Sequence, residues 1–278
     1  MSAVTSAAAS AATSAATSAR LGVMLTELRL PTMKRLVPEV CVQSDREGWP
    51  GHQLVETLLE HEMNEREVRR IERHRIESAL SPDKRLSSFD FAAVPCVSKA
   101  QVMALAQGHE WLQRGANVLL FGPPGVGKSH LVAGLGHALI DAGRRVLFTR
   151  CSELVQRLQA ARRDLRLAHE LAKLDRFDLL ILDDLSYVRR DQAETSVLFE
   201  LICERYERKS IAITANTPFS QWDEVFVDAA MTVAAVDRLV HHSTILEMNV
   251  QSYRRRAAQA AKAPARKTKP ATTTQATA

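Results

Sequence analysis

A glycine-rich octapeptide carries the most specific chemical pattern in the sequence. Residues 122–129 read GPPGVGKS and match G-x-x-x-x-G-K-[ST] at every fixed position. Glycines let backbone N–H groups converge on phosphate oxygens, and the start of the helix expected over Ser129–Ala142 adds positive potential. In such loops the lysine, here Lys128, reaches the β- and γ-phosphates, and the hydroxyl of Ser129 ligates Mg²⁺. We therefore predict that Ser129 ligates Mg²⁺ and that ATP binds at Gly122, Pro123, Pro124, Gly125, Val126, Gly127, Lys128, Ser129 and His130.

Two adjacent carboxylates follow a later apolar run. Asp183 and Asp184 come directly after Leu179–Leu182, and ligands in open α/β sheets lie beyond the carboxyl ends of the strands. We expect Asp183 to hold the Mg²⁺ shell and Asp184 to polarise an attacking water. Two neighbouring acids are also compatible with a solvated strand end, but the P-loop upstream favours the metal interpretation. Asp184 is one methylene shorter than the glutamate usually found there.

Two further polar residues could complete a hydrolytic site. The run Ile211–Ile213 ends in Thr-Ala-Asn, which places Asn216 between the two acids and the γ-phosphate, where it would orient water. The alternative is that Asn216 only forms a turn. Arg238 could supply charge to the γ-phosphate of a neighbouring chain, although its spacing alone favours a surface ion pair with Asp237 or Glu247.

Two clusters of arginines could contact DNA phosphates. Between Arg144 and Arg176 there are nine basic residues and four acidic ones, and Arg162, Arg163 and Arg166 lie close together. Nearer the N-terminus, four arginines share one face of an expected helix, although acids balance bases across that region: Arg66, Arg69, Arg70 and Arg73. A run of charge is also typical of a plain solvated face, so each cluster remains one of two alternatives.

Histidines and cysteines suggest no further metal site. The pair His241-His242 and the scattered His52, His61 and His74 show no partner cluster at metal-ligand spacing, so we expect no metal beyond Mg²⁺. Four cysteines lie far apart without a C-x-x-C pair, which indicates free thiols in a reducing cytoplasm: Cys41, Cys96, Cys151 and Cys203.

Length and composition limit the number of domains and the kind of fold that can position these residues. The chain has 278 residues, of which 46% are hydrophobic and 25% charged, and at roughly 150 residues per domain this allows about two domains. The longest apolar runs fall short of the roughly 20 residues that a membrane helix needs, so we expect no membrane association. The formal net charge is +5, but residues 250–278 hold seven Lys or Arg and no acid, so most of the excess belongs to that end.

The apolar pattern changes along the chain. Helical spacing predicts a helix over Thr26–Val37, with Pro38 near its end, and another over Gln53–Leu80. From Asn117 onward short apolar runs alternate with helical stretches, which predicts a parallel sheet covered on both faces, with strands at Val118–Phe121, Val146–Phe148, Leu179–Leu182, Ile211–Ile213 and Thr244–Leu246. We expect four segments: a disordered Ala/Ser/Thr-rich extension (1–19), a helical domain (20–85), an α/β domain (86–255) and a basic disordered tail (256–278).

Longer stretches resemble the IstB-like ATP-binding proteins of insertion sequences. The resemblance covers roughly Leu21 to Arg254 and is carried by FGPPGVGKSHLVAGLGHALIDAGRRVLF, FDLLILDDLSYVRRDQAE, ITANTPFSQW and VDRLVHHSTILEMN, with LTELRLPTMKRL and SSFDF before them. GPPGxGKxH and DDL are shared with the DnaC-like helicase loaders. LRLPTM and VDRLVHHS are more similar to the insertion-sequence group.

This resemblance implies a fold and an activity. The fold is an AAA+ P-loop α/β domain with three layers and a five-stranded parallel sheet, preceded by a small all-helical domain. The activity is ATP hydrolysis in a cytoplasmic homo-oligomer that forms through ATP-bridged interfaces on duplex DNA, deforms the DNA and recruits a partner transposase. In the family pattern Asn216 matches the sensor residue and Arg238 matches the arginine supplied to the neighbouring ATP. Arg162, Arg163 and Arg166 lie where related ATPases insert a DNA-contacting helix.

Three other functions are weighed against this one. A DnaC-like helicase loader would engage a replicative helicase and prefer single-stranded DNA. A P-loop kinase would need a substrate pocket with a lid. A nucleotide-gated scaffold would bind ATP with negligible turnover.

Overall fold

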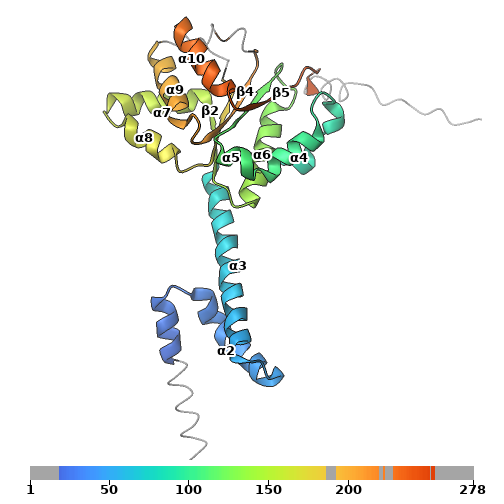
Figure 1. Ribbon diagram of the computed structural model, residues 1–278, viewed down its shortest axis with the longest axis vertical. Coiled ribbons are helices and arrows are strands. Elements are labelled where there is room, and N and C mark those ends of the chain that lie inside the picture. Colours follow the sequence, from blue (N-terminus) through green and yellow to red (C-terminus); the bar gives the residue numbers. More distant parts are fainter. Residues whose placement is uncertain (1–18, 186–191, 219–221, 223–227, 251, 254–278) are drawn as a thin grey trace, which may run out of the picture. The chain divides into compact units, whose positions relative to one another are not determined.

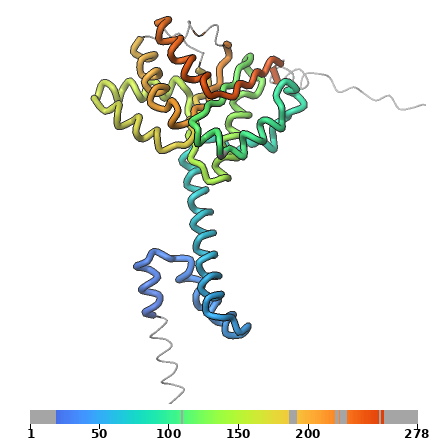
Figure 2. The backbone as a smooth tube through the Cα atoms, in the orientation of Figure 1, coloured from blue at the N-terminus to red at the C-terminus, as the bar shows by residue number. Residues whose placement is uncertain are grey.

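The computed structural model describes residues 19–185, 192–218, 222, 228–250 and 252–253 (Figure 1, Figure 2). The chain divides into two compact units, Met1–Arg73 and His74–Ala278. This division falls earlier than the limit at residue 85 that the sequence suggested. The expected extension (1–19), apart from residue 19, and the expected tail (256–278) lie outside the described residues, and the domain limits stay a prediction.

The first unit is built from helices. Residues 19–27 are helical, and they are followed by α2 (Pro31–Glu47) and by α3 (Gly51–Glu77), which extends four residues into the second unit. The prediction of a single helix over Thr26–Val37 is wrong. The helix is interrupted at residues 28–30, where Arg29 has φ 55°. Pro31 then opens α2, because a proline without an N–H group fits the first turn of a helix, and α2 continues past Pro38.

A buried carboxylate joins α2 to α3 within this unit. Glu62 of α3 accepts hydrogen bonds from the N–H groups of Thr32 (2.8 Å) and Met33 (3.0 Å) at the start of α2. Its carboxylate also pairs with Arg66 at 3.0 Å, and its side chain is only 3% exposed. Burial by itself raises the pKa of Glu62, but these hydrogen bonds and the charge of Arg66 outweigh it and leave the pKa below its ordinary value.

The second unit contains the predicted parallel sheet. Its strands are β1 (Asn117–Phe121), β2 (Val146–Arg150), β3 (Leu179–Asp183), β4 (Ser210–Ala215) and β5 (Ser243–Glu247). They pair in the order β2-β3-β4-β1-β5, and every pair is parallel. All five strand predictions and the α/β fold class are confirmed. Because the strands are parallel, the ends of β1, β3 and β4 meet at one edge of the sheet.

Helices cover both faces of this sheet (Figure 1). Strand side chains such as Leu180, Leu182 and Ile213 pack in one core cluster with residues of α7 (Cys151–Arg163), α9 (Gln192–Arg205) and α10 (Ala229–Val240). Opposite them lie α6 (Lys128–Asp141), which contacts four of the strands, and α4 (Lys99–Gln107), which packs on α6. The short helices α5 (His109–Gln113) and α8 (Leu167–Leu174) complete the unit, with 3-10 turns at Leu86–Ser88 and Phe91–Ala93. Within the described part of the chain, no helix has the length and apolarity to cross a membrane.

Candidate nucleotide site

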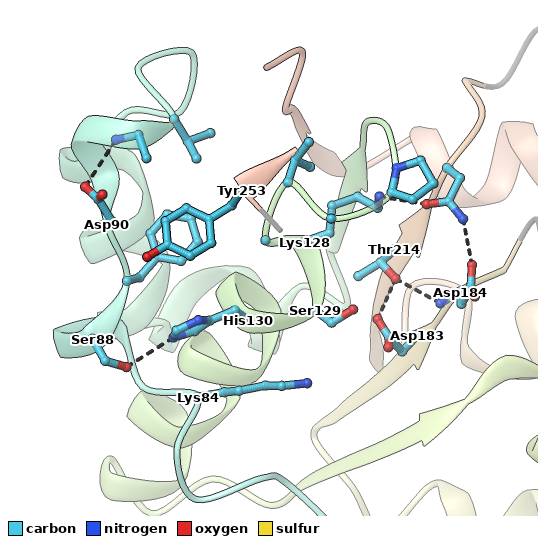
Figure 3. A pocket seen from close by; sticks show the side chains of 18 of the residues that line it. Lys84, Ser88, Asp90, Lys128, Ser129, His130, Asp183, Asp184, Thr214 and Tyr253 are labelled. Atoms are coloured by element: carbon cyan, nitrogen blue, oxygen red, sulfur yellow. Dashed lines mark hydrogen bonds between the residues drawn. The ribbon is translucent and has the colours of Figure 1, made fainter. Parts of the chain in front are cut away.

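A cavity of about 760 Å³ lies where β1, β3 and β4 end (Figure 3). Most of the residues predicted for the site line it: Pro124, Gly125, Val126, Gly127, Lys128, Ser129, His130, Asp183, Asp184 and Asn216. A cavity of this volume is within the range of small-molecule and cofactor sites.

The backbone of the P-loop needs its glycines. Gly122 has φ 150°, and a Cβ placed there would come within 2.5 Å of the carbonyl oxygen of Met248. Gly127 has φ 104° and caps α6, which begins at Lys128. The loop therefore delivers the positive end of α6 to the cavity, as an anion site requires.

Lys128 lies at the centre of the polar contacts. Its ammonium group donates to the carbonyl oxygens of Gly122 (2.6 Å) and Pro123 (3.0 Å), and to Oδ1 of Asn216 at 2.8 Å. The side chain is buried. The ammonium of the P-loop lysine is thus held beside the residue at the end of β4 that sequence reasoning placed between the acids and the phosphate.

The two acids after β3 have different partners. The Thr214 hydroxyl donates to Oδ1 of Asp183 (2.7 Å) and accepts from the backbone N–H of Asp184 (2.9 Å). Asn216 donates through Nδ2 to Oδ1 of Asp184 at 3.0 Å. Asp184 also has φ 65°, a left-handed conformation that is uncommon without glycine and is often found at functional sites. The structure therefore connects Lys128, Asn216 and Asp184 in one hydrogen-bonded chain.

The environment of Asp184 changes its protonation. Burial raises the pKa of this carboxyl, and the neighbouring charge of Asp183 raises it further. Lys128, the hydrogen bond from Asn216 and the charge of Arg150 act in the opposite direction without cancelling the rise. A carboxylate with a raised pKa is a better proton acceptor than an ordinary aspartate, which suits a general base.

Ser129 and Asp183 supply oxygen ligands on one side of the cavity (Figure 3). A hydroxyl and a carboxylate that face the same space beside a phosphate-binding loop fit the oxygen coordination that Mg²⁺ prefers. Bound there, Mg²⁺ would neutralise charge on the phosphates. Its presence at these residues remains a proposal.

Several lining residues were missed in the sequence. His130 Nε2 lies 3.1 Å from the Ser88 hydroxyl, and the ring of Phe89 contacts His130 edge-on with ring centres 5.4 Å apart. The backbone N–H of Tyr253 donates to the carbonyl oxygen of Gly125 at 3.0 Å. Lys84 and Arg150 also line the cavity. SSFDF had marked Ser88 and Phe89 as part of a recognisable segment, but spacing gave no sign that they reach the nucleotide pocket.

Arg238 lies outside the nucleotide cavity of its own chain. Its guanidinium donates to the carbonyl oxygen of Ala234 at 2.9 Å and lies 5.4 Å from the ring centre of Phe199. The surface pairs with Asp237 or Glu247 that spacing favoured are not among its contacts in the described residues. A role at the ATP of a neighbouring chain stays a prediction.

Most of the arginines expected at DNA are engaged in local contacts. Arg162 pairs with Glu200 at 2.9 Å, Arg166 with Asp164 at 2.8 Å, and Arg70 with Glu67 at 2.6 Å. Arg66 pairs with Glu62, as described above. Arg73 donates to the carbonyl oxygen of Arg69 at 3.4 Å. Arg163 is exposed at the end of α7. The binding of these arginines to DNA stays a prediction.

The fold and the site together define a class of protein. A five-stranded parallel sheet in this order, with a P-loop after β1 and paired acids after β3, has the fold of AAA+ P-loop domains. The chain belongs to the family of IstB-like ATP binding proteins, whose sequence profile matches residues 23–261.

Individual relatives agree with this assignment. An insertion sequence ATP-binding protein of Sinorhizobium fredii is 66% identical over 243 residues, which cover 87% of this chain and 82% of that protein. The ATP-binding protein of insertion sequence IS21 from Pseudomonas aeruginosa is 36% identical over 84% of this chain and 88% of its own length. Among solved structures, AMPPCP-bound DnaA from Aquifex aeolicus superposes with a TM-score of 0.53 at 18% identity, over 68% of this chain and 59% of that chain. This last likeness shows the fold alone.

Proposed function

We propose that the protein is an ATP-hydrolysing helper of transposition, which assembles on duplex DNA when ATP is bound and recruits a partner transposase. The observation that carries the hydrolytic part is the connected set of Lys128, Asn216 and Asp184 beside Asp183 and Ser129. The insertion-sequence part is supported by the relatives, which are named as ATP-binding proteins of insertion sequences.

Each residue has a distinct part in the proposed hydrolysis. Asp184 accepts the proton of a water whose oxygen attacks the γ-phosphorus, and the bond from that phosphorus to the ADP oxygen breaks. Asn216 orients the water and keeps Lys128 close to the phosphate oxygens. Ser129 and Asp183 would hold Mg²⁺. An Asn216 amide already bonded to both Lys128 and Asp184 supports this division of roles.

The position of Arg238 supports the proposed assembly. Arg238 does not line the cavity of its own chain, so an ATP that it contacts would belong to a neighbouring chain, as the family pattern implies. An arginine supplied in trans stabilises the transition-state charge and links hydrolysis to the presence of the neighbour. We therefore propose a homo-oligomer with ATP at its interfaces.

Contacts to DNA are assigned to the two arginine clusters. Ion pairs between two exposed side chains contribute at most about 1 kcal/mol, so Arg162, Arg166 and Arg70 can exchange a carboxylate for a phosphate. Arg66 differs, because its partner Glu62 is buried. Arg162, Arg163 and Arg166 form one candidate contact; Arg66, Arg70 and Arg73 form the other. We propose that the protein acts on DNA in the cytoplasm.

The proposal is tested by measuring ATP turnover with and without duplex DNA. We expect slow hydrolysis by the protein alone, stimulation by duplex DNA, and loss of both in Lys128→Ala. Turnover that responds only to single-stranded DNA and a hexameric helicase would favour a helicase loader. Phosphate transfer to a small molecule without DNA would identify a kinase. ATP binding without turnover in any condition would identify a nucleotide-gated scaffold.

A further inference from the structure

Three side chains of types that can bind metal ions lie close together on the surface of the second unit, outside the nucleotide cavity. Glu207 follows α9, and His241 and His242 follow α10. Oε1 of Glu207 lies 3.6 Å from Nδ1 of His241 and 3.8 Å from Nε2 of His242. One donor atom from each of the three residues lies within 4.8 Å of the others. From the sequence we expected no metal site at the histidine pair, because sequence spacing could not show that a residue 34 positions earlier lies beside it.

The backbone that carries the histidines is held in place. The N–H of Asn117 at the start of β1 donates to the carbonyl oxygen of His242 at 2.7 Å. The buried side chain of Asn117 donates to the carbonyl oxygen of Leu239 (3.1 Å) and accepts from the N–H of Ile211 (2.9 Å). One asparagine thus ties the end of α10 to the sheet.

The backbone at Glu207 is held as well. Its φ of 55° lies in the left-handed region, which is uncommon for residues other than glycine. Gly115 packs against it so closely that a Cβ at Gly115 would lie 2.7 Å from the carbonyl carbon of Glu207. The N–H groups of Arg208 and Lys209 both donate to the carbonyl oxygen of Arg205 and close the turn. Backbone conformations of this kind persist where the surroundings enforce them, and they are frequent at binding sites.

The donor set and spacing suit a transition metal. Two imidazoles and one carboxylate form the three-ligand set of many zinc sites, which leave a fourth position for water. Donors about 2.1 Å from a tetrahedral zinc ion are a little over 3 Å apart. The two separations from Glu207, 3.6 and 3.8 Å, need to close by only a fraction of an ångström, and the donor nitrogens of the two histidines lie within 4.8 Å of each other. The side chains of Glu207, His241 and His242 are 53%, 49% and 53% exposed, so an ion can reach them.

A neighbouring tyrosine can form a hydrogen bond to the proposed metal ligands. The hydroxyl of Tyr206 lies 2.8 Å from Nδ1 of His241. When a metal takes Nδ1, the phenol can donate to the carboxylate, and such outer hydrogen bonds orient metal ligands.

We propose that Glu207, His241 and His242 bind one divalent transition-metal ion, with Zn²⁺ the best match to these donors. The ion joins the turn after α9 to the end of α10, the helix that carries Arg238 one turn earlier. It therefore fixes the end of the helix on which the proposed assembly arginine lies. This inference does not depend on the proposed function.

The test is a calorimetric titration of the full chain with ZnCl₂, in the presence of a non-thiol reductant and in the absence of nucleotide and Mg²⁺. We expect one equivalent to bind, and His242→Ala and Glu207→Gln each to weaken binding by more than about tenfold. His169→Ala is the matched control, because His169 is also exposed and also lies near a carboxylate, that of Glu170, and it should bind as the unmodified protein does. Zn²⁺ should likewise raise the melting temperature of the unmodified protein and the control, but not of the two site variants.

Cobalt provides a second readout that does not depend on affinity. Co²⁺ in a four-coordinate site gives visible absorption bands, which we expect in the unmodified protein and not in Glu207→Gln. ATP binding and far-ultraviolet circular dichroism check that each variant is folded. Zinc affinity unchanged in both site variants, loss of binding in the His169 control, or no zinc binding by the unmodified protein would each overturn the proposal.

Discussion

Asn216 makes the contacts that hold the nucleotide site together. Its amide oxygen accepts from Lys128 and its amide nitrogen donates to Asp184, so one short side chain bridges the P-loop lysine and the acid that we propose to activate water. Thr214, two residues earlier on β4, holds Asp183 and the backbone of Asp184. A single strand end therefore positions both acids, and the chemistry of the site depends on the side chains at the end of β4 as much as on the P-loop.

Asp184→Asn tests the proposed base. The amide cannot accept a proton, so kcat for ATP hydrolysis should fall by about a hundredfold or more, while ATP still binds. Steady-state turnover and equilibrium binding of a fluorescent ATP analogue measure the two effects. Ordinary turnover in this variant would show that another group activates the water.

The raised pKa of Asp184 predicts the pH dependence of hydrolysis. The base works only when ionised, so kcat/KM should decline as pH falls through the raised pKa of the free protein. Because burial and Asp183 shift this pKa upward, the acid limb should lie above the ordinary aspartate value of 3.8. Asp184→Asn should lose this limb. An acid limb that persists unchanged in Asp184→Asn would assign it to another group.

At the scale of elements, strands were easier to predict than helix limits. Each strand contains a short apolar run between polar segments, and all five runs form the sheet. The helix over Thr26–Val37 failed because apolar spacing continues across residues 28–30, while Arg29 turns the chain and Pro31 starts a new helix. Tertiary neighbours such as Glu207 beside His242 leave no local pattern at all. Sequence motifs found the loop, the acids and Asn216, but not the wall formed by Ser88, Phe89 and Tyr253.

Glu62 should matter for the stability of the helical unit. Glu62→Ala removes the acceptor for two N–H groups and the partner of Arg66, which should cost about 2 kcal/mol of unfolding free energy. Glu65→Ala is the matched control, because Glu65 is a partly exposed acid on the same helix that pairs with Arg69. Urea unfolding followed by circular dichroism compares them. Equal losses in the two variants would contradict a special role for Glu62.

The same residue gives this unit a pH dependence. The pKa of Glu62 is lower in the folded state than in the unfolded state, so its contribution is complete above the unfolded pKa. That contribution is lost as pH falls through the lowered, folded value. The stability difference between the unmodified protein and Glu62→Gln should therefore shrink between neutral pH and about pH 3. A difference that stays constant over this range would show that the charge of Glu62 is not involved.

At the scale of the whole molecule, nucleotide, neighbour and DNA are proposed to act together. In this proposal, ATP bound by one chain would meet Arg238 of the next, and the resulting oligomer would present many arginines to DNA at once. Linked sites bind far more tightly than single ones, so weak individual phosphate contacts become sufficient. This coupling makes DNA binding depend on the nucleotide and hydrolysis depend on assembly.

Arg238→Ala separates assembly from nucleotide binding. The variant should bind ATP as the unmodified protein does, because Arg238 does not line its own cavity, but its hydrolysis should fall by about a thousandfold. Mixing it with Lys128→Ala should restore some turnover, because each variant supplies what the other lacks. ATP binding lost in Arg238→Ala, or mixtures without any recovery, would contradict action between chains.

The most direct measurement of the central claim is fluorescence anisotropy on duplex and single-stranded DNA of equal length, with ATP, ADP or no nucleotide, at one stated salt concentration. The account predicts tight binding to duplex DNA with ATP alone, and its loss in Lys128→Ala. Equal duplex binding in all nucleotide states, or full affinity in Lys128→Ala, would contradict the coupling. An ATP-dependent preference for single strands would instead indicate a helicase loader.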